Sequence, residues 1–306
     1  MNTSLTIEAA DLPRRPTVAL ALGSGGAKGL AHIGVIEELE TQGYRIAAIA
    51  GSSMGALVGG IHAAGKLDIY RDWVSALAKF DVLRLVDWTF SGGGLIKGER
   101  IIDTLRELIG DVLIEELPVA FTAVAVDLDR EREVWLSHGL LFDAIRASIA
   151  IPTVFRPHHI GGRRLVDGGL LNPVPVTPLI RETVDYLMAV SVDGIAVHSK
   201  PVPVEAEATE DAPGYRQRIG AFIGRLMAHG DNSDAPREPG ALELLTQSMD
   251  LMQANLARLR LAAYEPDLLI QLPRDMASIY EFYRARELIE LGRQQAREAL
   301  AHWPRR

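Results

Sequence analysis

The stretch IAGSSMGAL, residues 49–57, decides the fold of this chain. An apolar run at 45–50 ends abruptly at Gly51, and a helix of small residues follows at 56–61. This pattern predicts a strand, a tight turn and a helix, with Ser53 at the apex of the turn. The turn needs glycine two positions before and two after the serine, because a Cβ there would clash with the neighbouring strand or helix. Ser53 would then be strained and would lie at a helix N-terminus, where the helix dipole favours developing negative charge.

The same turn has a second interpretation. A G-x-S-x-G segment also serves tight packing alone, and the motif is too common to establish a catalytic serine by itself. The rest of the chain has to decide between the two interpretations.

The composition predicts a sizeable globular protein and excludes several functional classes. With 306 residues, 48% of them hydrophobic, the chain can bury a large core. It has no cysteine, which excludes disulfides, thiolate metal sites and a cysteine nucleophile. The formal charge of −8 argues against nucleic acid as a partner, because nucleic-acid binders present a basic face. There is no signal-peptide core and no apolar run of bilayer length, so we expect a cytoplasmic protein.

The opening of the chain predicts an α/β fold. An apolar strand at 17–22 leads into a glycine-rich loop at 23–29 and a helix to about residue 41, before the strand and helix around Ser53. This order predicts parallel strands joined by right-handed crossovers. Further strands are expected at 118–127 with a hairpin partner at 133–136, and at 164–166, 186–192 and 267–272, with helices at 67–80, 99–109, 140–147, 241–263 and 278–302.

We expect one domain with a loose leader. Residues 1–15 form the leader and 16–306 the domain, which includes an acidic, proline-rich excursion at about 197–239 and a helical C-terminal part at about 240–306. The apolar stripe of the helix at 241–263 is expected to pack on the sheet. It consists of Leu242, Leu245, Met249, Met252 and Leu256. The basic, apolar segment 215–227 suits a peripheral membrane contact, while a plain surface helix or a dimer contact stays open.

Three glycine-bearing turns, at 23–29, 51–55 and 167–169, each follow an apolar strand, and we expect them at the carboxyl edge of a parallel sheet. The N–H groups of the first turn suit either a phosphate cradle or an oxyanion hole. A P-loop requires Ser or Thr after its lysine, whereas Lys28 is followed by Gly29. An elbow serine beside an N–H-rich loop is better explained by acyl transfer, in which the loop stabilises the oxyanion that the serine creates.

Asp167 is the favoured base for Ser53. It lies on a sharp turn directly after a strand, although an aspartate there also serves to shape the backbone. His158 and His159 precede that strand, and His198 is the one histidine that suits the hydrolase order Ser, Asp, His. Nothing around His198 constrains it, so a Ser–Asp pair is the preferred hypothesis.

These blocks, in this order, resemble the patatin-like phospholipases, a family of acyl hydrolases with a Ser–Asp dyad. The matching blocks are the glycine-rich loop with Lys28, the elbow at Ser53, Ala147-Ser148-Ile149-Ala150-Ile151-Pro152 and Asp167-Gly168-Gly169. The similarity covers about residues 18–192 and is greatest to compact bacterial members and to domains related to the neuropathy target esterase. It implies a three-layer α/β/α sandwich with a mostly parallel central sheet, followed by C-terminal helices.

The resemblance also implies a role for each motif residue. Ser53 is expected to be the nucleophile and Asp167 the base, with a pKa raised by burial, and the oxyanion hole is expected from Gly25, Gly26 and Ala27. The supporting positions are Ser24, Lys28, Gly29, Gly51, Gly55, Gly168 and Gly169. Ser24 departs from the family's usual triple glycine but keeps an N–H.

Two functional classes stay open at this point. The first is a serine acyl hydrolase acting on lysophospholipids, phospholipids or simple fatty acyl esters. The second is a non-catalytic binding or regulatory protein that uses the glycine-rich loop for an anionic ligand. No cofactor and no metal are expected, the expected partner is a lipid or fatty acyl ester, and the sequence does not indicate an oligomeric state.

Overall fold

The structure, a computed structural model, describes residues 14–79, 81, 98–152, 154–195 and 241–304. Its contacts divide the chain into a large unit, Met1–Val197 with Met249–Arg306, and a small unit, His198–Ser248. Residues 1–13 of the leader predicted at 1–15 lie outside the described residues, as do the excursion at 197–239 and its segment 215–227. All of the motifs singled out above belong to the large unit.

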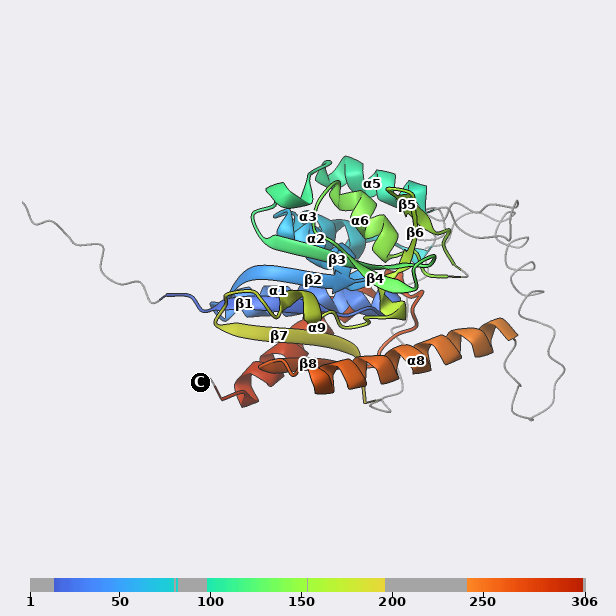
Figure 1. The fold of residues 1–306 in the computed structure, drawn as a ribbon. Coiled ribbons are helices and arrows are strands. Elements are labelled where there is room, and N and C mark those ends of the chain that lie inside the picture. The colour runs from blue at the N-terminus through green and yellow to red at the C-terminus, as the bar shows by residue number, and fades with distance from the viewer. Residues whose placement is uncertain (1–13, 80, 82–97, 153, 196–240, 305–306) are drawn as a thin grey trace, which may run out of the picture. The chain divides into compact units, whose positions relative to one another are not determined.

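An eight-stranded sheet forms the centre of the large unit, in the order β5-β6-β3-β2-β1-β7-β8, with β4 paired to β3 (Figure 1). The pairs β1–β2, β1–β7, β2–β3 and β7–β8 are parallel, which confirms a mostly parallel sheet. The strands are β1 (Thr17–Leu22), β2 (Arg45–Ser52), β3 (Ala120–Asp127), β4 (Arg132–Leu136), β5 (His158–Ile160), β6 (Arg163–Asp167), β7 (Tyr186–Gly194) and β8 (Leu268–Pro273).

Helices cover both faces of this sheet. They are α1 (Ala31–Thr41), α2 (Met54–Ala63), α3 (Leu67–Ala76), α5 (Glu99–Ile109), α6 (Leu141–Ser148), α8 (Ala241–Ala263) and α9 (Ala285–His302). Short 3-10 helices are η1 (Gly26–Leu30), η2 (Ile114–Glu116), η3 (Gly168–Leu170), η4 (Thr177–Leu179) and η5 (Phe282–Arg284). In Figure 1, α2, α5 and α6 gather near β3, whereas α8 lies on the side of β7 and β8.

The side chains of β1 explain why the two faces differ. Val18, Leu20 and Leu22 point into the larger core, which also contains residues of α1, α2, α3, α5, α6 and α9. Ala19 and Ala21 point to the other face, where further alanines of β2 and β7 meet α8. Small side chains on this second face allow a helix to approach closely.

Helix α8 packs differently from the expectation. Among the described side chains of α8, Ala257 is buried, with Leu261 packed beside it against the alanine face. Met252, a member of the predicted stripe that lies in the large unit, is 61% exposed. The prediction that the stripe packs on the sheet was therefore wrong for Met252, because the alanine face accepts a small residue rather than a row of long ones.

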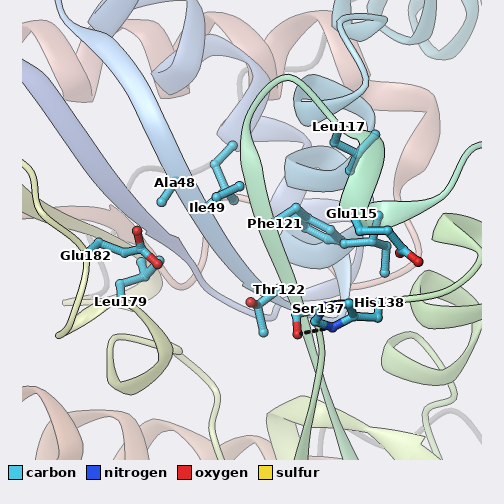
Figure 2. A pocket seen from close by; sticks show the side chains of 12 residues that line it. Ala48, Ile49, Glu115, Leu117, Phe121, Thr122, Ser137, His138, Leu179 and Glu182 are labelled. Atoms are coloured by element: carbon cyan, nitrogen blue, oxygen red, sulfur yellow. Dashed lines mark hydrogen bonds between the residues drawn. The ribbon is translucent and has the colours of Figure 1, made fainter.

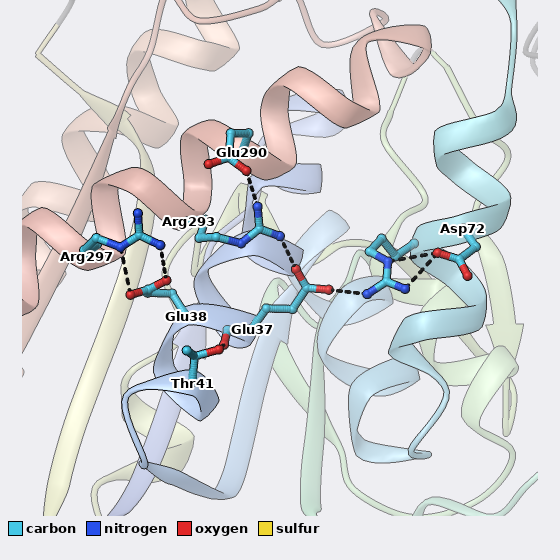
Figure 3. A network of polar contacts seen from close by, with 8 residues as sticks. Glu37, Glu38, Thr41, Asp72, Glu290, Arg293 and Arg297 are labelled. Carbon is cyan, nitrogen blue, oxygen red and sulfur yellow. Dashed lines mark hydrogen bonds and ion pairs between the residues drawn. The ribbon is translucent and has the colours of Figure 1, made fainter.

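The last helix, α9, packs backbone to backbone against α1. A Cβ on Gly34 would overlap the carbonyl oxygen of Ile289, and one on Gly292 would overlap that of Ala31. Ion pairs flank this contact: Arg297 binds Glu38 through Nε at 3.1 Å and Nη2 at 2.9 Å (Figure 3). The side chain of Glu37 accepts from both Arg293 of α9 and Arg71 of α3. Since α1 directly follows the glycine-rich loop, α9 braces the element that carries the loop.

The pairing of β3 brings the second and third motifs together. Its first half pairs with β2, up to Ser52 opposite Val124, and its last three residues pair with β6, from Asp167 opposite Ala125. Strand β6 is antiparallel to β3, so the expectation that Asp167 follows a strand of the parallel set was wrong. The carboxyl ends of β2 and β6 instead meet end to end along β3, which places Asp167 beside Ser53.

Within the described part of the chain, no helix has both the length and the apolar character needed to cross a membrane.

Candidate active site

Ser53 has the backbone conformation of a strained turn. Its φ is 53° and its ψ is −122°, a left-handed region that non-glycine residues seldom adopt. It forms the N-cap of α2 and is only 4% exposed. A hydroxyl in this position meets the positive end of the helix dipole, which stabilises negative charge that develops on a bound group.

The motif glycines are the places where the motifs touch one another. A Cβ on Gly55 would overlap the carbonyl of Leu22 at the end of β1, and one on Gly51 would overlap Gly55. A Cβ on Gly29 would lie 2.6 Å from the Cβ of Met54, the residue after Ser53. On the third turn, a Cβ on Gly168 would overlap the carbonyl of Val124. The chain therefore needs glycine at these positions so that its three turns can meet.

Ser148, in the third matching block, fixes the elbow. Its Oγ accepts the Ser53 N–H at 2.9 Å and donates to the carbonyl of Val124 at 2.6 Å. In the same block, the carbonyl of Ala150 accepts the Asp167 N–H at 3.0 Å. The sequence showed this block as a match but gave no sign of these contacts. The end of α6 thus holds the backbone of both predicted dyad residues.

Asp167 is buried, with 3% of its surface exposed, and its Oδ1 accepts the Gly169 N–H at 2.7 Å. Burial raises the pKa of Asp167 from 3.8 to about 7, because a desolvated carboxylate loses its hydration. The neighbouring Ser53 hydroxyl and the Gly169 N–H oppose this rise of the pKa by favouring the ionised form. The upward shift of the Asp167 pKa agrees with the expectation from the sequence.

The Ser53 and Asp167 side chains are adjacent without a regular hydrogen bond. Within the described residues, Oδ2 of Asp167 has no hydrogen-bond partner that satisfies both distance and angle. The Ser53 hydroxyl nevertheless lies close enough to influence the carboxyl. Such loose contacts are common between catalytic groups before a substrate aligns them.

The glycine-rich loop offers two of the three predicted oxyanion donors. The Ala27 N–H is donated to the carbonyl of Ile279 at 3.0 Å, and the Ser24 N–H to that of Pro173 at 2.8 Å. Within the described residues, the N–H groups of Gly25 and Gly26 make no backbone hydrogen bond. A Cβ on Gly25 would overlap the side chain of Val192, so only glycine fits there. Gly25 and Gly26 thus remain as candidate donors.

Two buried side chains hold this loop in place. His32 of α1 is fully buried, and its Nε2 lies 2.8 Å from the carbonyl oxygen of Gly23. Burial lowers the pKa of His32 to about 4, so the ring is neutral and Nε2 carries the hydrogen that it donates. The Lys28 ammonium forms an ion pair of 3.1 Å with Asp193 at the end of β7. His32 was not singled out from the sequence, since its role depends on a contact within the folded loop.

In the described chain, no histidine is hydrogen-bonded to Ser53 or Asp167. His158 instead has its Nε2 3.8 Å from Oδ1 of Asp143, and His198 lies outside the described residues. The described residues also include no group of three or more His, Asp or Glu side chains that is placed to hold a metal ion.

The family follows from comparison with known proteins. A family model described as patatin-like phospholipase matches residues 20–180, which include the loop, Ser53 and Asp167. The chain belongs to the patatin-like phospholipase family. This family hydrolyses lipid esters. The match confirms the resemblance predicted from the sequence at the level of the family, and the sheet covered by helices confirms the predicted fold class.

Several relatives of this patatin-like protein are informative. It is 41% identical to an uncharacterized NTE family protein of Mycobacterium tuberculosis, over 93% of this chain and 91% of the relative. A lysophospholipase of Emericella nidulans is 27% identical over 58% of this chain, which corresponds to 12% of that larger protein. Among solved structures, VipD from Legionella pneumophila aligns with a TM-score of 0.47 at 14% identity, over 95% of this chain and 67% of VipD.

This patatin-like protein also has a separate cavity of about 440 Å³, which lies beside residues 48–49 of β2 and 120–122 of β3 (Figure 2). Phe121, Leu179 and Ile49 supply apolar walls, and Glu115, His138 and Glu182 supply polar ones. None of the predicted dyad, oxyanion or supporting residues lines it. Its histidine, His138, contacts the hydroxyl of Ser137 rather than either dyad residue.

Proposed function

We propose that the chain is a serine acyl hydrolase that cleaves carboxylic ester bonds of lysophospholipids, phospholipids or related fatty acyl esters through an acyl-enzyme. The observation that carries this proposal is the pairing of a strained serine at a helix N-terminus with a buried aspartate. Burial raises the pKa of that aspartate to about 7, near the pH at which a general base is most effective. The family membership supports a lipid ester as the substrate.

Ser53 acts as the nucleophile in this proposal. Ionised Asp167 accepts the proton of the Ser53 hydroxyl while Oγ attacks the carbonyl carbon of the ester. The negative charge that develops on the carbonyl oxygen is stabilised by the N–H groups of Gly25 and Gly26 and by the dipole of α2. The intermediate then collapses, the protonated Asp167 returns its proton to the leaving alcohol, and the acyl group remains on Ser53.

A dyad is sufficient because the environment performs the task that an imidazole has in a triad. A water-exposed carboxylate is too weak a base at neutral pH, whereas the desolvated Asp167 has a pKa of about 7. The turn at Gly169 and the contact with Ala150 hold Asp167 in place, as the third member of a triad holds its histidine. A cytoplasmic location and a peripheral membrane contact through residues 215–227 stay predictions.

The decisive experiment is labelling with a fluorophosphonate probe, which reacts with activated serines. We expect the wild type to be labelled at Ser53, as peptide mass spectrometry would show, and Ser53→Ala to remain unlabelled. Asp167→Asn should lose hydrolysis of a lysophospholipid and of a short fatty acyl ester. The matched controls His158→Ala and His159→Ala should retain both activities.

Either of two results would contradict the proposal. Ester turnover by Asp167→Asn at a rate near that of the wild type would remove Asp167 as the base. Folded wild-type protein that is neither labelled nor active, with or without lipid vesicles, would favour the non-catalytic binding protein.

A further inference from the structure

Two buried oxygen atoms in the active site lack partners. Ser24 is 4% exposed and Asp167 is 3% exposed. Within the described residues, neither the Oγ of Ser24 nor the Oδ2 of Asp167 has a hydrogen-bond partner. A buried polar atom without a partner lowers stability because it has lost its hydration, so such an atom calls for another polar molecule to bind it.

The two side chains flank the same point on the turn that carries Asp167. The position that a Cβ on Gly169 would occupy lies 2.9 Å from the Oγ of Ser24 and 3.0 Å from the Oδ1 of Asp167. Both side chains therefore lie against the α-carbon of Gly169, where even a methyl group would crowd the Ser24 side chain. The Ser24 hydroxyl and the Asp167 carboxyl are thus close neighbours, and a bridging water, which binds between two or more polar partners, would satisfy both.

The backbone that carries Ser24 and the backbone that carries Asp167 are both fixed by hydrogen bonds. The N–H groups of Gly23 and Ser24 donate to the carbonyls of Val190, at 3.0 Å, and Pro173, at 2.8 Å. On the other side, Asp167 is held by Ala150 through its N–H and by Gly169 through Oδ1. The Ser24 hydroxyl is thus a preorganised group rather than a mobile surface serine.

We propose that the Ser24 hydroxyl positions the water that hydrolyses the acyl-enzyme. This inference rests on the proposed function, because it concerns the second half of the same reaction. It assigns to Ser24 a role in deacylation and none in the attack of Ser53 on the ester.

The step can be written with all atoms accounted for. The water donates one hydrogen to Ser24 Oγ and the other to Oδ2 of Asp167, so that a lone pair of its oxygen faces the acyl carbon. As the new C–O bond forms, Asp167 accepts the proton, and Gly25 and Gly26 stabilise the oxyanion. The bond between the acyl carbon and Ser53 Oγ then breaks, the Asp167 proton passes to Ser53, and a free fatty acid leaves.

The test separates acylation from deacylation. Wild type, Ser24→Ala and Ser24→Thr would be mixed with a fatty acyl ester of a fluorescent alcohol, and the first burst of alcohol would report acylation. Intact-mass spectrometry of quenched samples would follow the acyl adduct on Ser53 as it decays. Ser137→Ala, at the remote cavity, is the matched serine control.

We expect Ser24→Ala to acylate at a rate within about twofold of the wild type and to deacylate about tenfold more slowly, as for the loss of one hydrogen bond. The acyl adduct should accumulate, and Ser24→Thr, which keeps the hydroxyl, should deacylate faster than Ser24→Ala. Ser137→Ala should match the wild type in both steps. If Ser24→Thr fails to fold, Ser24→Gly provides a second variant without the hydroxyl and should behave as Ser24→Ala does.

Two outcomes would overturn the inference and leave the dyad intact. Unchanged deacylation in Ser24→Ala would reduce Ser24 to a packing residue. Acylation and deacylation slowed by the same factor would place it in the oxyanion hole or the loop framework instead. Wild type that is not labelled by the fluorophosphonate would contradict the proposed function itself, and that result is distinguishable because it does not depend on Ser24.

Discussion

In the proposed mechanism, Asp167 sets the pH range in which the site can work. The base must be ionised before it can accept the proton of Ser53, and its pKa is raised to about 7 by burial. We therefore expect kcat/KM for ester hydrolysis to rise about tenfold per pH unit below about pH 6 and to level off above about pH 8. A pH profile on a soluble short-chain ester would test this, with protein folding checked at each pH. A flat profile between about pH 5 and pH 8 would exclude a base with this pKa.

Ser148 is a second residue whose loss should be felt at the dyad. In Ser148→Ala, the Ser53 N–H and the Val124 carbonyl both lose their partner while buried. We expect a free energy of unfolding lower by about 1–3 kcal/mol. We also expect kcat to be lower by about tenfold to a hundredfold, since the elbow is no longer held.

Denaturant unfolding and steady-state kinetics would measure the two effects of Ser148→Ala. Ser137→Ala again serves as a control with unchanged kcat. If Ser148→Ala lost stability while kcat stayed at the wild-type value, the contact would support folding without positioning Ser53.

The difference between Ser53 and Ser148 shows how far residue-level prediction reaches. Ser53 was identified from the sequence because the glycines that its turn requires lie within two positions of it. Ser148 lies 95 positions away from Ser53, and its contact exists only after α6 has packed against β3. The donors of the loop show the same limit: Ala27 was predicted as a donor, but its N–H is taken by Ile279, from the far end of the chain.

At the level of elements, the α/β order and the parallel direction of most strands were predictable, and the direction of β6 was not. Alternating strands and helices around Ser53 indicated parallel pairing, and β1, β2, β3, β7 and β8 have it. Strand β6 is only five residues long, and such a segment carries no signal of its direction. For α8, the apolar stripe indicated a helix but not the face that packs, because the alanines that select Ala257 lie on other strands.

The contact between α1 and α9 gives a prediction at this scale. In Gly292→Ala, the new Cβ would overlap the Ala31 carbonyl, and neither backbone can move without separating the helices. We expect this variant to lose about 1–3 kcal/mol of unfolding free energy, the usual cost of overpacking. Gln294→Ala on the exposed side of the same helix should change it by no more than about 0.5 kcal/mol. Equal stability of the two variants would show that α9 does not sit directly on α1.

At the scale of the whole molecule, the buried carboxyl should lower the stability of the protein at neutral and alkaline pH. The pKa of Asp167 is about 7 in the folded chain and 3.8 without burial, so between these values the unfolded chain binds fewer protons at this site. The folded state is therefore destabilised progressively as pH rises from about 4 to about 7, by about 1.4 kcal/mol per pH unit, and the loss is constant above that range.

Asp167→Asn removes this cost. We expect the variant to be inactive and yet to melt at a higher temperature than the wild type at about pH 8, with the difference shrinking toward zero near about pH 4. Thermal unfolding followed by circular dichroism at both pH values would show this. A variant that is less stable than the wild type at the higher pH would indicate that Asp167 stabilises the fold instead of straining it.

The contact between α1 and α9 also has a consequence for folding during synthesis. Ile279, which accepts the Ala27 N–H of the glycine-rich loop, and α9, which braces α1, leave the ribosome long after that loop. A nascent chain that already carries the elbow and the aspartate turn therefore still lacks the supports of its oxyanion loop. We expect the growing polypeptide to gain the proposed activity toward lipid esters only after α9 has emerged and docked on α1.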